Sequence, residues 1–361
     1  MFDRRLLQNF DWILLCLLIL ISAASLTNLY SAGGTQIMMK QVYWYLIGFG
    51  LLMLMTTFDY HALERLAWHI YLLTIILLVL VMVIGMISKG AQRWLNLGFI
   101  NIQPSELAKL SIVIILAQFF STHGEYPDYR LRDLWQPFLL ILVPCLLIGE
   151  QPDLGSALVL AIVAFSIILL MKVRWTSLFI LIATTLVAAV PCYFTLLNEY
   201  QKKRIHTFLN PESDPLGAGY HIIQSKIAVG SGLLTGKGYL KGTQTRLHFL
   251  PEQHTDFAFS VWAEEWGFFG SIFLLILYLF LILWGINIAK NSKDKFGSTL
   301  AIGITALVFW QMVINVGMTI GLLPVVGIPL VLFSYGGSSV LATMLGMGLL
   351  MNISIRRFMF Q

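Results

Sequence analysis

The chain has 361 residues, of which 58% are hydrophobic and only 11% are charged. An average soluble domain is about 25% charged, so the composition excludes a water-soluble globular protein, a coiled coil and a disordered tail. Ten apolar segments of about 20 residues, the length that spans a bilayer core, would explain it. The basic residues of such a chain usually lie in loops, where they set membrane orientation. The net charge of +5 therefore predicts no nucleic-acid partner.

The lengths of the apolar runs predict an all-α, polytopic membrane protein with about ten transmembrane helices. In chain order, the predicted helices cover residues 12–31, 42–58, 67–87, 104–121, 136–149, 155–171, 176–197, 257–286, 298–320 and 331–353. We treat the whole chain, 1–361, as a single membrane domain. The eighth predicted helix opens with an acidic pair, Glu264 and Glu265, which is unusual for a spanning segment.

Lysine and arginine residues predict the orientation of these helices. With the N-terminus inside, the cytoplasmic segments hold twelve of them and the short outside loops hold three. The excess of positive charge therefore places both termini in the cytoplasm. The long connection 198–256, between the seventh and eighth helices, then lies outside. Long connections are often functional. Its stretch 222–234 is too short to span and could lie on the membrane surface or form a re-entrant turn.

Glu106 and Lys109 stand at the start of the fourth predicted helix. Ionisable residues at membrane depth cost about 2.5–3.5 kcal/mol on insertion scales and are functional candidates by default. Residues three apart lie on the same helix face, so we expect these two side chains to pair. The pair either locks helix packing or takes part in function.

Two further carboxylates precede predicted helices. Asp153 could cap the sixth helix, or it could point into a cavity and hold a basic partner or a substrate group. In the same way, Thr255 or Asp256 could cap the eighth helix. A carboxylate two residues from His254, at the mouth of an apolar helix, also suits a general base. Asp256 is therefore a catalytic candidate.

The segment from Asn315 to Ser339 is rich in glycine and proline, which predicts a loop that dips into the outer surface before the last helix. Backbone groups freed there must be satisfied by protein or by ligand. The candidate binding residues in this loop are Ser334, Gly336, Gly337 and Ser338. No sequence pattern for ATP, nicotinamide or structural zinc occurs.

Five segments, which together cover most of the chain, carry a resemblance to one known family. They are residues 90–109, 150–157, 204–232, 236–270 and 315–339. With them the chain resembles the SEDS family (shape, elongation, division and sporulation), and residues 10–12 and 210–212 resemble its elongation branch. The resemblance implies a peptidoglycan glycosyltransferase in the bacterial cytoplasmic (inner) membrane. Such an enzyme polymerises lipid II into glycan strands at the outer face during cell elongation.

The resemblance also implies roles for individual residues. The essential aspartate of the family matches Asp256, and its outside-turn aspartate matches Asp153. Its helix-four glutamate and lysine match Glu106 and Lys109. Asp256 would then act as the general base that accepts the proton of a sugar hydroxyl.

The leaving group of that reaction, undecaprenyl pyrophosphate, needs positive charge. Arg204, Lys109 or another loop cation could supply it, or a carboxylate-held Mg²⁺ or other divalent cation could. The sequence leaves this choice open. The implied partner is a class B penicillin-binding protein that supplies transpeptidase activity, and other proteins of the elongation complex are further candidates.

Two alternatives from other functional classes remain at this stage. One is a transporter that flips lipid II across the membrane, and the other is a non-enzymatic scaffold that holds cell-wall enzymes together. A flippase should place its important charges along a path between the two faces, whereas the candidates here cluster toward the outside. A scaffold would not need Asp256.

Overall fold

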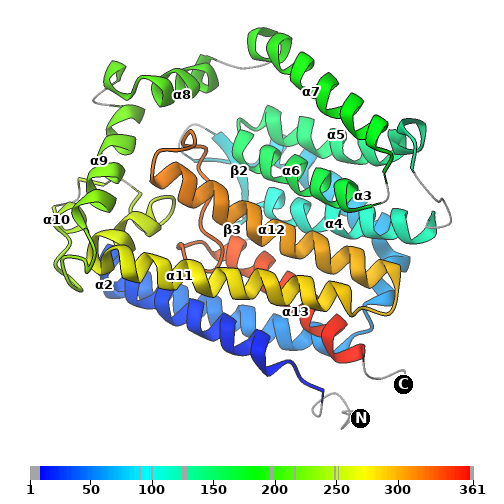
Figure 1. Ribbon diagram of the computed structural model, residues 1–361, viewed down its shortest axis with the longest axis horizontal. Coiled ribbons are helices and arrows are strands. Elements are labelled where there is room, and N and C mark those ends of the chain that lie inside the picture. Colours follow the sequence, from blue (N-terminus) through cyan, green and yellow to red (C-terminus); the bar gives the residue numbers. More distant parts are fainter. Residues whose placement is uncertain are drawn as a thin grey trace.

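The computed structural model describes residues 9–88, 91–96, 98, 101–123, 129–171, 173–195, 199–214, 217–247, 249–250 and 252–357. Over these residues the chain forms a helical bundle (Figure 1). Its main helices are α2 (Trp12–Thr57), α3 (His61–Ile84), α4 (Pro104–Thr122), α5 (Trp135–Glu150), α6 (Leu154–Leu170), α7 (Trp175–Thr195), α11 (Ala258–Lys290), α12 (Lys295–Thr319) and α13 (Gly337–Arg356). Every predicted apolar run lies wholly or largely within one of these helices.

Seven of the described helices are long and apolar enough to cross a membrane, namely α2, α3, α4, α5 with the preceding turn η1 (Leu131–Leu134), α11, α12 and α13. The helix α6 and the described part of α7 are apolar but shorter. The helix α2 contains two of the predicted helices. Counted in this way, the seven long helices together with α6 and α7 agree with a bundle of about ten.

The helix α2 doubles back at Gly34, whose φ of 70° and ψ of −172° lie in a region open to glycine. A straight helix of 46 residues would be about 69 Å long. Instead, Ser25 and Tyr45 donate hydrogen bonds to two successive carbonyls, those of Phe333 and Leu332. The two arms of α2 therefore lie side by side, which confirms the separate helices predicted at 12–31 and 42–58.

A second glycine interrupts α11, and the prediction of one helix over 257–286 is wrong at this point. Gly267 has φ 63° and ψ −158°, and it divides α11 into a short arm and a long spanning arm. A Cβ atom at Gly267 would lie 2.3 Å from the backbone nitrogen of Gly236. The amide of Phe268 donates to the carbonyl of Leu233. The long connection therefore packs directly against the break.

Contacts with α2 show the direction in which the short arm of α11 runs. Asn28 donates to the carbonyl of Ala258, whereas Ser31, which is closer to the bend of α2, donates to Glu265. The short arm thus begins inside the bundle and runs outward to Gly267. The two residues immediately before it, Asp256 and Phe257, therefore lie at the end of the short arm opposite Gly267.

The described part of the connection 198–256 contains four helical elements joined by turns. They are α8 (Glu199–Leu209), the turn η2 (Pro211–Ser213), α9 (Ala218–Ser231) and α10 (Thr243–Arg246). The stretch 222–234, expected on the membrane surface or as a re-entrant turn, lies largely in α9. There Ser225 is buried and bonds to Ser260 at 2.7 Å. This stretch therefore packs on the short arm of α11.

The two termini and the long connection lie at opposite ends of the bundle. Ser354, near the end of α13, donates to Asp11 at the start of α2 with a distance of 2.6 Å. Figure 1 shows the N- and C-terminal ends together, with α8, α9 and α10 gathered at the other end. This arrangement agrees with an even number of membrane crossings.

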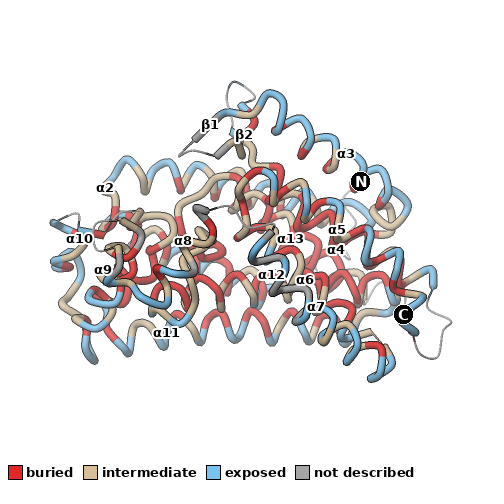
Figure 2. The backbone as a smooth tube through the Cα atoms, turned by 90° about the horizontal axis from the view of Figure 1, so that it is seen from above, coloured by how far each residue is buried: buried red, intermediate tan, exposed pale blue. Residues whose placement is uncertain are grey.

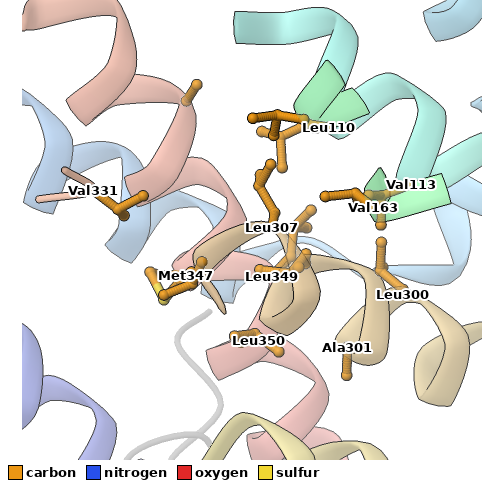
Figure 3. Packing of buried hydrophobic residues seen from close by; sticks show 14 of the residues in the cluster. Leu110, Val113, Val163, Leu300, Ala301, Leu307, Val331, Met347, Leu349 and Leu350 are labelled. Atoms are coloured by element: carbon orange, nitrogen blue, oxygen red, sulfur yellow. The ribbon is translucent and has the colours of Figure 1, made fainter. Parts of the chain in front are cut away.

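The main hydrophobic core includes side chains from α2, α3, α4, α5, α6, α11, α12 and α13. Figure 3 shows side chains from α4, α6, α12 and α13 meeting, with Leu110, Val113, Val163, Leu307 and Met347 among them. In Figure 2 the buried residues concentrate in the middle of the bundle, whereas α3 is largely exposed. Apolar side chains on that exposed face are expected for a helix that meets lipid.

A small antiparallel sheet connects α3 to α4, in a region that the sequence analysis left without an element. Its strands are β1 (Met86–Ser88), β2 (Ala91–Asn96) and β3 (Asn101–Ile102), in that order. The sheet leads directly into Gln103 and the start of α4. It lies at the end of the bundle where the candidate site residues gather.

Candidate active site

Asp256 lies in a turn that precedes the short arm of α11. The N-cap residue of α11 is Phe257, and it makes no side-chain cap hydrogen bond. Thr255 instead bonds to Glu252 through its hydroxyl group, at 3.1 Å to the carboxylate. The interpretation of Thr255 or Asp256 as a helix cap is therefore wrong. Asp256 is half-buried.

A loop formed by residues 320–336, between α12 and α13, borders the Asp256 carboxylate. Asn315 donates from its amide nitrogen to the carbonyls of Asp256 and Ile328, at 2.9 and 2.7 Å. A Cβ atom at Gly327 would lie 3.5 Å from Oδ2 of Asp256, and Gly327 has a φ of 75°. Gly327 therefore places only backbone beside the carboxylate of Asp256.

A loop precedes the last helix as predicted, but that helix begins later than the predicted residue 331. The chain stays non-helical through Gly336, and α13 starts at Gly337. Ser334 accepts a hydrogen bond from the amide of Leu330 at 3.0 Å. The amide of Tyr335 donates to the carbonyl of His254 at 2.8 Å. His254 is therefore tied to the loop through its backbone.

Glycines and serines at the end of this loop contact α2 and the sheet. The amide of Gly336 donates to Gln41, and a Cβ atom at Gly337 would lie 2.5 Å from the ring of Trp44. Ser338 donates to the carbonyl of Asn101 at 2.9 Å. These contacts give the four predicted binding residues local structural partners, and their roles toward substrate stay predictions.

Asp153 combines the two interpretations that the sequence left open. It accepts a hydrogen bond from the amide of Ser156 at 3.3 Å and so caps α6. It also accepts from Gln103 at 3.1 Å and lies 3.9 Å from the guanidinium of Arg93. Sequence reasoning missed Arg93 as a site residue. Its only signal was its position inside the segment 90–109 that carries the family resemblance.

The start of α6 also contacts the 320–336 loop. A Cβ atom at Gly155 would lie 2.5 Å from the carbonyl oxygen of Val326. Val326 of this loop thus contacts α6, the helix that Asp153 caps, and the next residue, Gly327, lies beside Asp256. This brings two carboxylates that are far apart in the sequence to one end of the bundle.

Glu106 and Lys109 form the predicted ion pair. The Nζ atom of Lys109 lies 2.6 Å from Oε1 of Glu106, and the side chains are 2% and 7% exposed respectively. The helix that carries them, α4, is buried on nearly every side. A burial this deep makes the pair sensitive to the loss of either charge.

Two basic side chains from the long connection approach the same region. Arg204 on α8 donates to the carbonyl of Val325 at 3.1 Å. His221 on α9 stacks on Phe257, with ring centroids 6.2 Å apart. Burial lowers the pKa of His221, the charge of Glu252 opposes this shift, and the charge of Arg204 adds to it. Together these effects lower the pKa of His221, which lies near the Asp256 turn.

Among the described residues, no three His, Cys, Asp or Glu side chains are placed to hold a metal ion together. Mg²⁺ is often bound by only one or two carboxylates together with substrate phosphates. In a magnesium site of this kind, the phosphates of the substrate would supply the remaining ligands.

Glu264 fastens the long connection to the short arm of α11. Its Oε1 atom accepts hydrogen bonds from the amides of Thr243 and Gln244 at 2.8 and 3.0 Å. The same atom lies 2.7 Å from Nζ of Lys237, and Glu264 is fully buried. The acidic pair at 264–265 therefore binds the loop and the first arm of α2 instead of entering a long spanning helix.

We expect Glu264→Gln to loosen this attachment. The substitution removes the charge that accepts hydrogen bonds from Lys237, Thr243 and Gln244, and hydrogen bonds to charged groups contribute about 1.5–3 kcal/mol. Amide hydrogen exchange over residues 236–247 should become at least about tenfold faster, since about 1.4 kcal/mol corresponds to a factor of ten. Glu64→Gln on α3 is the matched control. Equal exchange rates in the two variants would contradict the attachment.

The family described as cell cycle proteins, which groups FtsW, RodA and SpoVE, matches residues 5–358. The peptidoglycan glycosyltransferase MrdB of Escherichia coli strain K12 is 44% identical, over 97% of this chain and 95% of its own.

Two solved structures are similar over nearly the whole chain. One belongs to a study of how a peptidoglycan synthase complex coordinates polymerization and crosslinking, with a TM-score of 0.84, 32% identity, and 97% of this chain and 98% of that chain covered. The other is the crystal structure of the rod shape determining protein RodA of Thermus thermophilus, with a TM-score of 0.73, 31% identity and the same coverage. Sequence and fold thus agree, and the chain belongs to the FtsW/RodA/SpoVE family.

Proposed function

We propose that the chain polymerises lipid II into glycan strands, with Asp256 as the general base. It is a peptidoglycan glycosyltransferase of the elongation type, in keeping with its 44% identity to MrdB. The observation that supports the site is the position of Asp256. Asp256 is half-buried, and its carboxylate lies beside the backbone of Gly327.

The reaction requires a proton acceptor and a stabilised leaving group. The 4-hydroxyl oxygen of the acceptor sugar attacks the anomeric carbon of the donor, and the new C–O bond forms as the bond to pyrophosphate breaks. Asp256 takes the hydroxyl proton, a task that contributes about 10²–10⁴-fold to the rate. The pyrophosphate departs with the electron pair of the broken bond and carries added negative charge.

We propose that Arg204, and not Lys109, stabilises the negative charge of the departing pyrophosphate. Lys109 is 2% exposed and paired with Glu106 at 2.6 Å, whereas Arg204 reaches the loop that borders Asp256. A fixed cation aimed at developing charge lowers the barrier most effectively. A divalent cation such as Mg²⁺, bound through a carboxylate and the phosphates, would strengthen this effect, and no step above depends on it.

We also propose that both termini lie in the cytoplasm and that the reaction occurs at the outer face of the bacterial inner membrane. Basic residues gather where α11 ends, α12 begins and α13 ends, at Lys290, Lys293, Lys295, Arg356 and Arg357. This is the end of the bundle at which the termini meet. Cytoplasmic loops are enriched in such residues, so Asp256 faces the opposite side.

The flippase and scaffold alternatives are less well supported by this geometry. Asp153, Arg204 and Asp256 gather at one end of the bundle and do not mark a path between the faces. Incubating the purified chain with lipid II, alone and with its partner, tests the proposal directly. We expect a ladder of glycan strands. Transfer of lipid II between leaflets without polymer would favour the flippase, and neither activity would favour the scaffold.

We expect a class B penicillin-binding protein to raise the polymerisation rate. A partner that contacts only the active arrangement of the connection 198–256 shifts its population by its differential affinity, and about 1.4 kcal/mol gives tenfold. The relevant measurement is the rate at saturating lipid II with and without the partner, alongside hydrogen exchange of the connection. If neither the rate nor the exchange changes, the partner does not activate the chain.

A further inference from the structure

Three successive backbone carbonyls in the 320–336 loop accept hydrogen bonds from three hydroxyl groups. The pairs are Tyr278 with Val331, Tyr45 with Leu332 and Ser25 with Phe333. In a helix or a sheet these carbonyls would bond to other backbone groups. Here the segment 331–333 has neither, and buried carbonyls must find partners elsewhere. Side chains from both arms of α2 and from the long arm of α11 provide them.

The backbone of this segment is strained at one residue. Leu332 has a φ of 58°, in the left-handed region that residues other than glycine rarely adopt. Such a conformation persists only when the surrounding structure over-determines it. The Tyr45 hydroxyl holds the Leu332 carbonyl, and the side chain of Val331 lies in the hydrophobic core (Figure 3). The hydroxyls and the core together keep the segment in place.

The other parts of the same loop contact the Asp256 turn. Gly327 lies against the Asp256 carboxylate, and Asn315 bridges the carbonyls of Asp256 and Ile328. The amide of Tyr335 bonds to the carbonyl of His254. The held segment 331–333 lies between these two sets of contacts. A shift of the segment would therefore move the backbone on which Asp256 rests.

We propose that Tyr45 and Tyr278 are positioning residues for Asp256. Neither residue touches the carboxylate; they hold the 331–333 segment so that Gly327 and Tyr335 fix the turn that carries it. This inference rests on the proposed function. A general base must stay within about 2.6–3.2 Å of the proton it removes, and a misplacement of about 1 Å can cost about 10²-fold. Removing the hydroxyls should thus lower kcat more than it raises KM.

The experiment uses the full chain with its penicillin-binding protein and compares Tyr45→Phe, Tyr278→Phe and the double variant. Tyr71→Phe is the matched control, because Tyr71 is also buried and its hydroxyl donates to a carbonyl, that of Leu140, at 3.1 Å. That contact joins α3 to α5, away from Asp256. The readouts are kcat, KM, the pH profile of kcat and the thermal midpoint.

We expect each single variant to lower kcat at least about tenfold and the double variant about a hundredfold, with KM changed less than about twofold. The acidic limb of the kcat profile, which reports the base in the complex, should shift in the double variant. Tyr71→Phe should lower the thermal midpoint by a similar amount and leave kcat and its pH profile unchanged.

Unchanged kcat and pH profile in the Tyr45 and Tyr278 variants, with a loss of stability like that of Tyr71→Phe, would overturn the inference. Ser25→Ala removes the third hydroxyl with the smallest change and provides the same comparison if the double variant does not fold. Asp256→Asn separates the two claims. If it is inactive while the tyrosine variants are fully active, only this inference fails, and if it is active, the proposed function fails.

Discussion

Asp256→Asn is expected to lower the rate of glycan polymerisation by about 10²–10⁴-fold or more, the contribution of a well-placed general base. The substitution keeps the size of the side chain and removes its basicity. Because Asp256 is half-buried and lies outside the N-cap position of α11, the fold and partner binding should stay near those of the unchanged chain. The measurement is the rate of strand formation by purified protein with lipid II and its partner.

A matched control for this substitution lies in the turn η1. Asp133 accepts a hydrogen bond from the amide of Arg130, on the exposed surface and outside the candidate site. Asp133→Asn should leave the polymerisation rate unchanged. A wild-type rate in the Asp256 variant would remove this residue from the mechanism, whatever the result of the control.

The second large effect is expected at Glu106 and Lys109. Removing one member of a buried pair strands the other charge and costs about 3–5 kcal/mol, so Glu106→Gln and Lys109→Met should each strongly lower the free energy of unfolding. The double variant leaves no stranded charge and should cost less than the sum of the two. A double-mutant cycle measures this coupling.

The exposed pair of Lys203 and Asp214 provides the comparison for that cycle. Its atoms are 3.0 Å apart, but the lysine side chain is 63% exposed. Exposed pairs typically contribute about 0–1 kcal/mol, so its coupling energy should be small. Strict additivity at Glu106 and Lys109 would show that their contact contributes nothing to the stability of the chain.

The order of the apolar helices could be predicted because a bilayer sets their length and apolarity. The same reasoning could not detect the break at Gly267, since the apolar run 257–286 contains three glycines and its pattern does not single out this one. The break depends on Gly236 and Leu233, which pack against it from the long connection. A contact of this kind depends on tertiary structure and produces no periodic pattern of apolar residues in the sequence.

The start of the last helix was misplaced for a related reason. Residues 328–333 are apolar except for Pro329, so run length alone favours helix from residue 331. The segment 331–333 forms a turn instead of a helix, and its carbonyls bond to hydroxyls on α2 and α11. These hydroxyls belong to residues between 53 and more than 300 positions away. Sequence reasoning did foresee that backbone groups in this loop would need such partners.

At the candidate site, charged residues were easier to identify than the groups that hold them. Glu106, Asp153 and Asp256 stood out because carboxylates are rare in an apolar chain. Arg93, which faces Asp153 at 3.9 Å, was passed over because a loop arginine is ordinary. Asn315 was seen only as part of a glycine-rich segment, although its amide joins Asp256 to the loop.

The central claim is that the chain builds glycan at the face of the membrane where Asp256 lies. Proteoliposomes with the chain in one orientation, together with its partner, test it when lipid II is confined to a single leaflet. Polymer should form only when lipid II is in the leaflet on the Asp256 side, and Asp256→Asn should form none. Polymer from lipid II confined to the leaflet on the side of the termini, or equal polymer from the variant, would contradict the account.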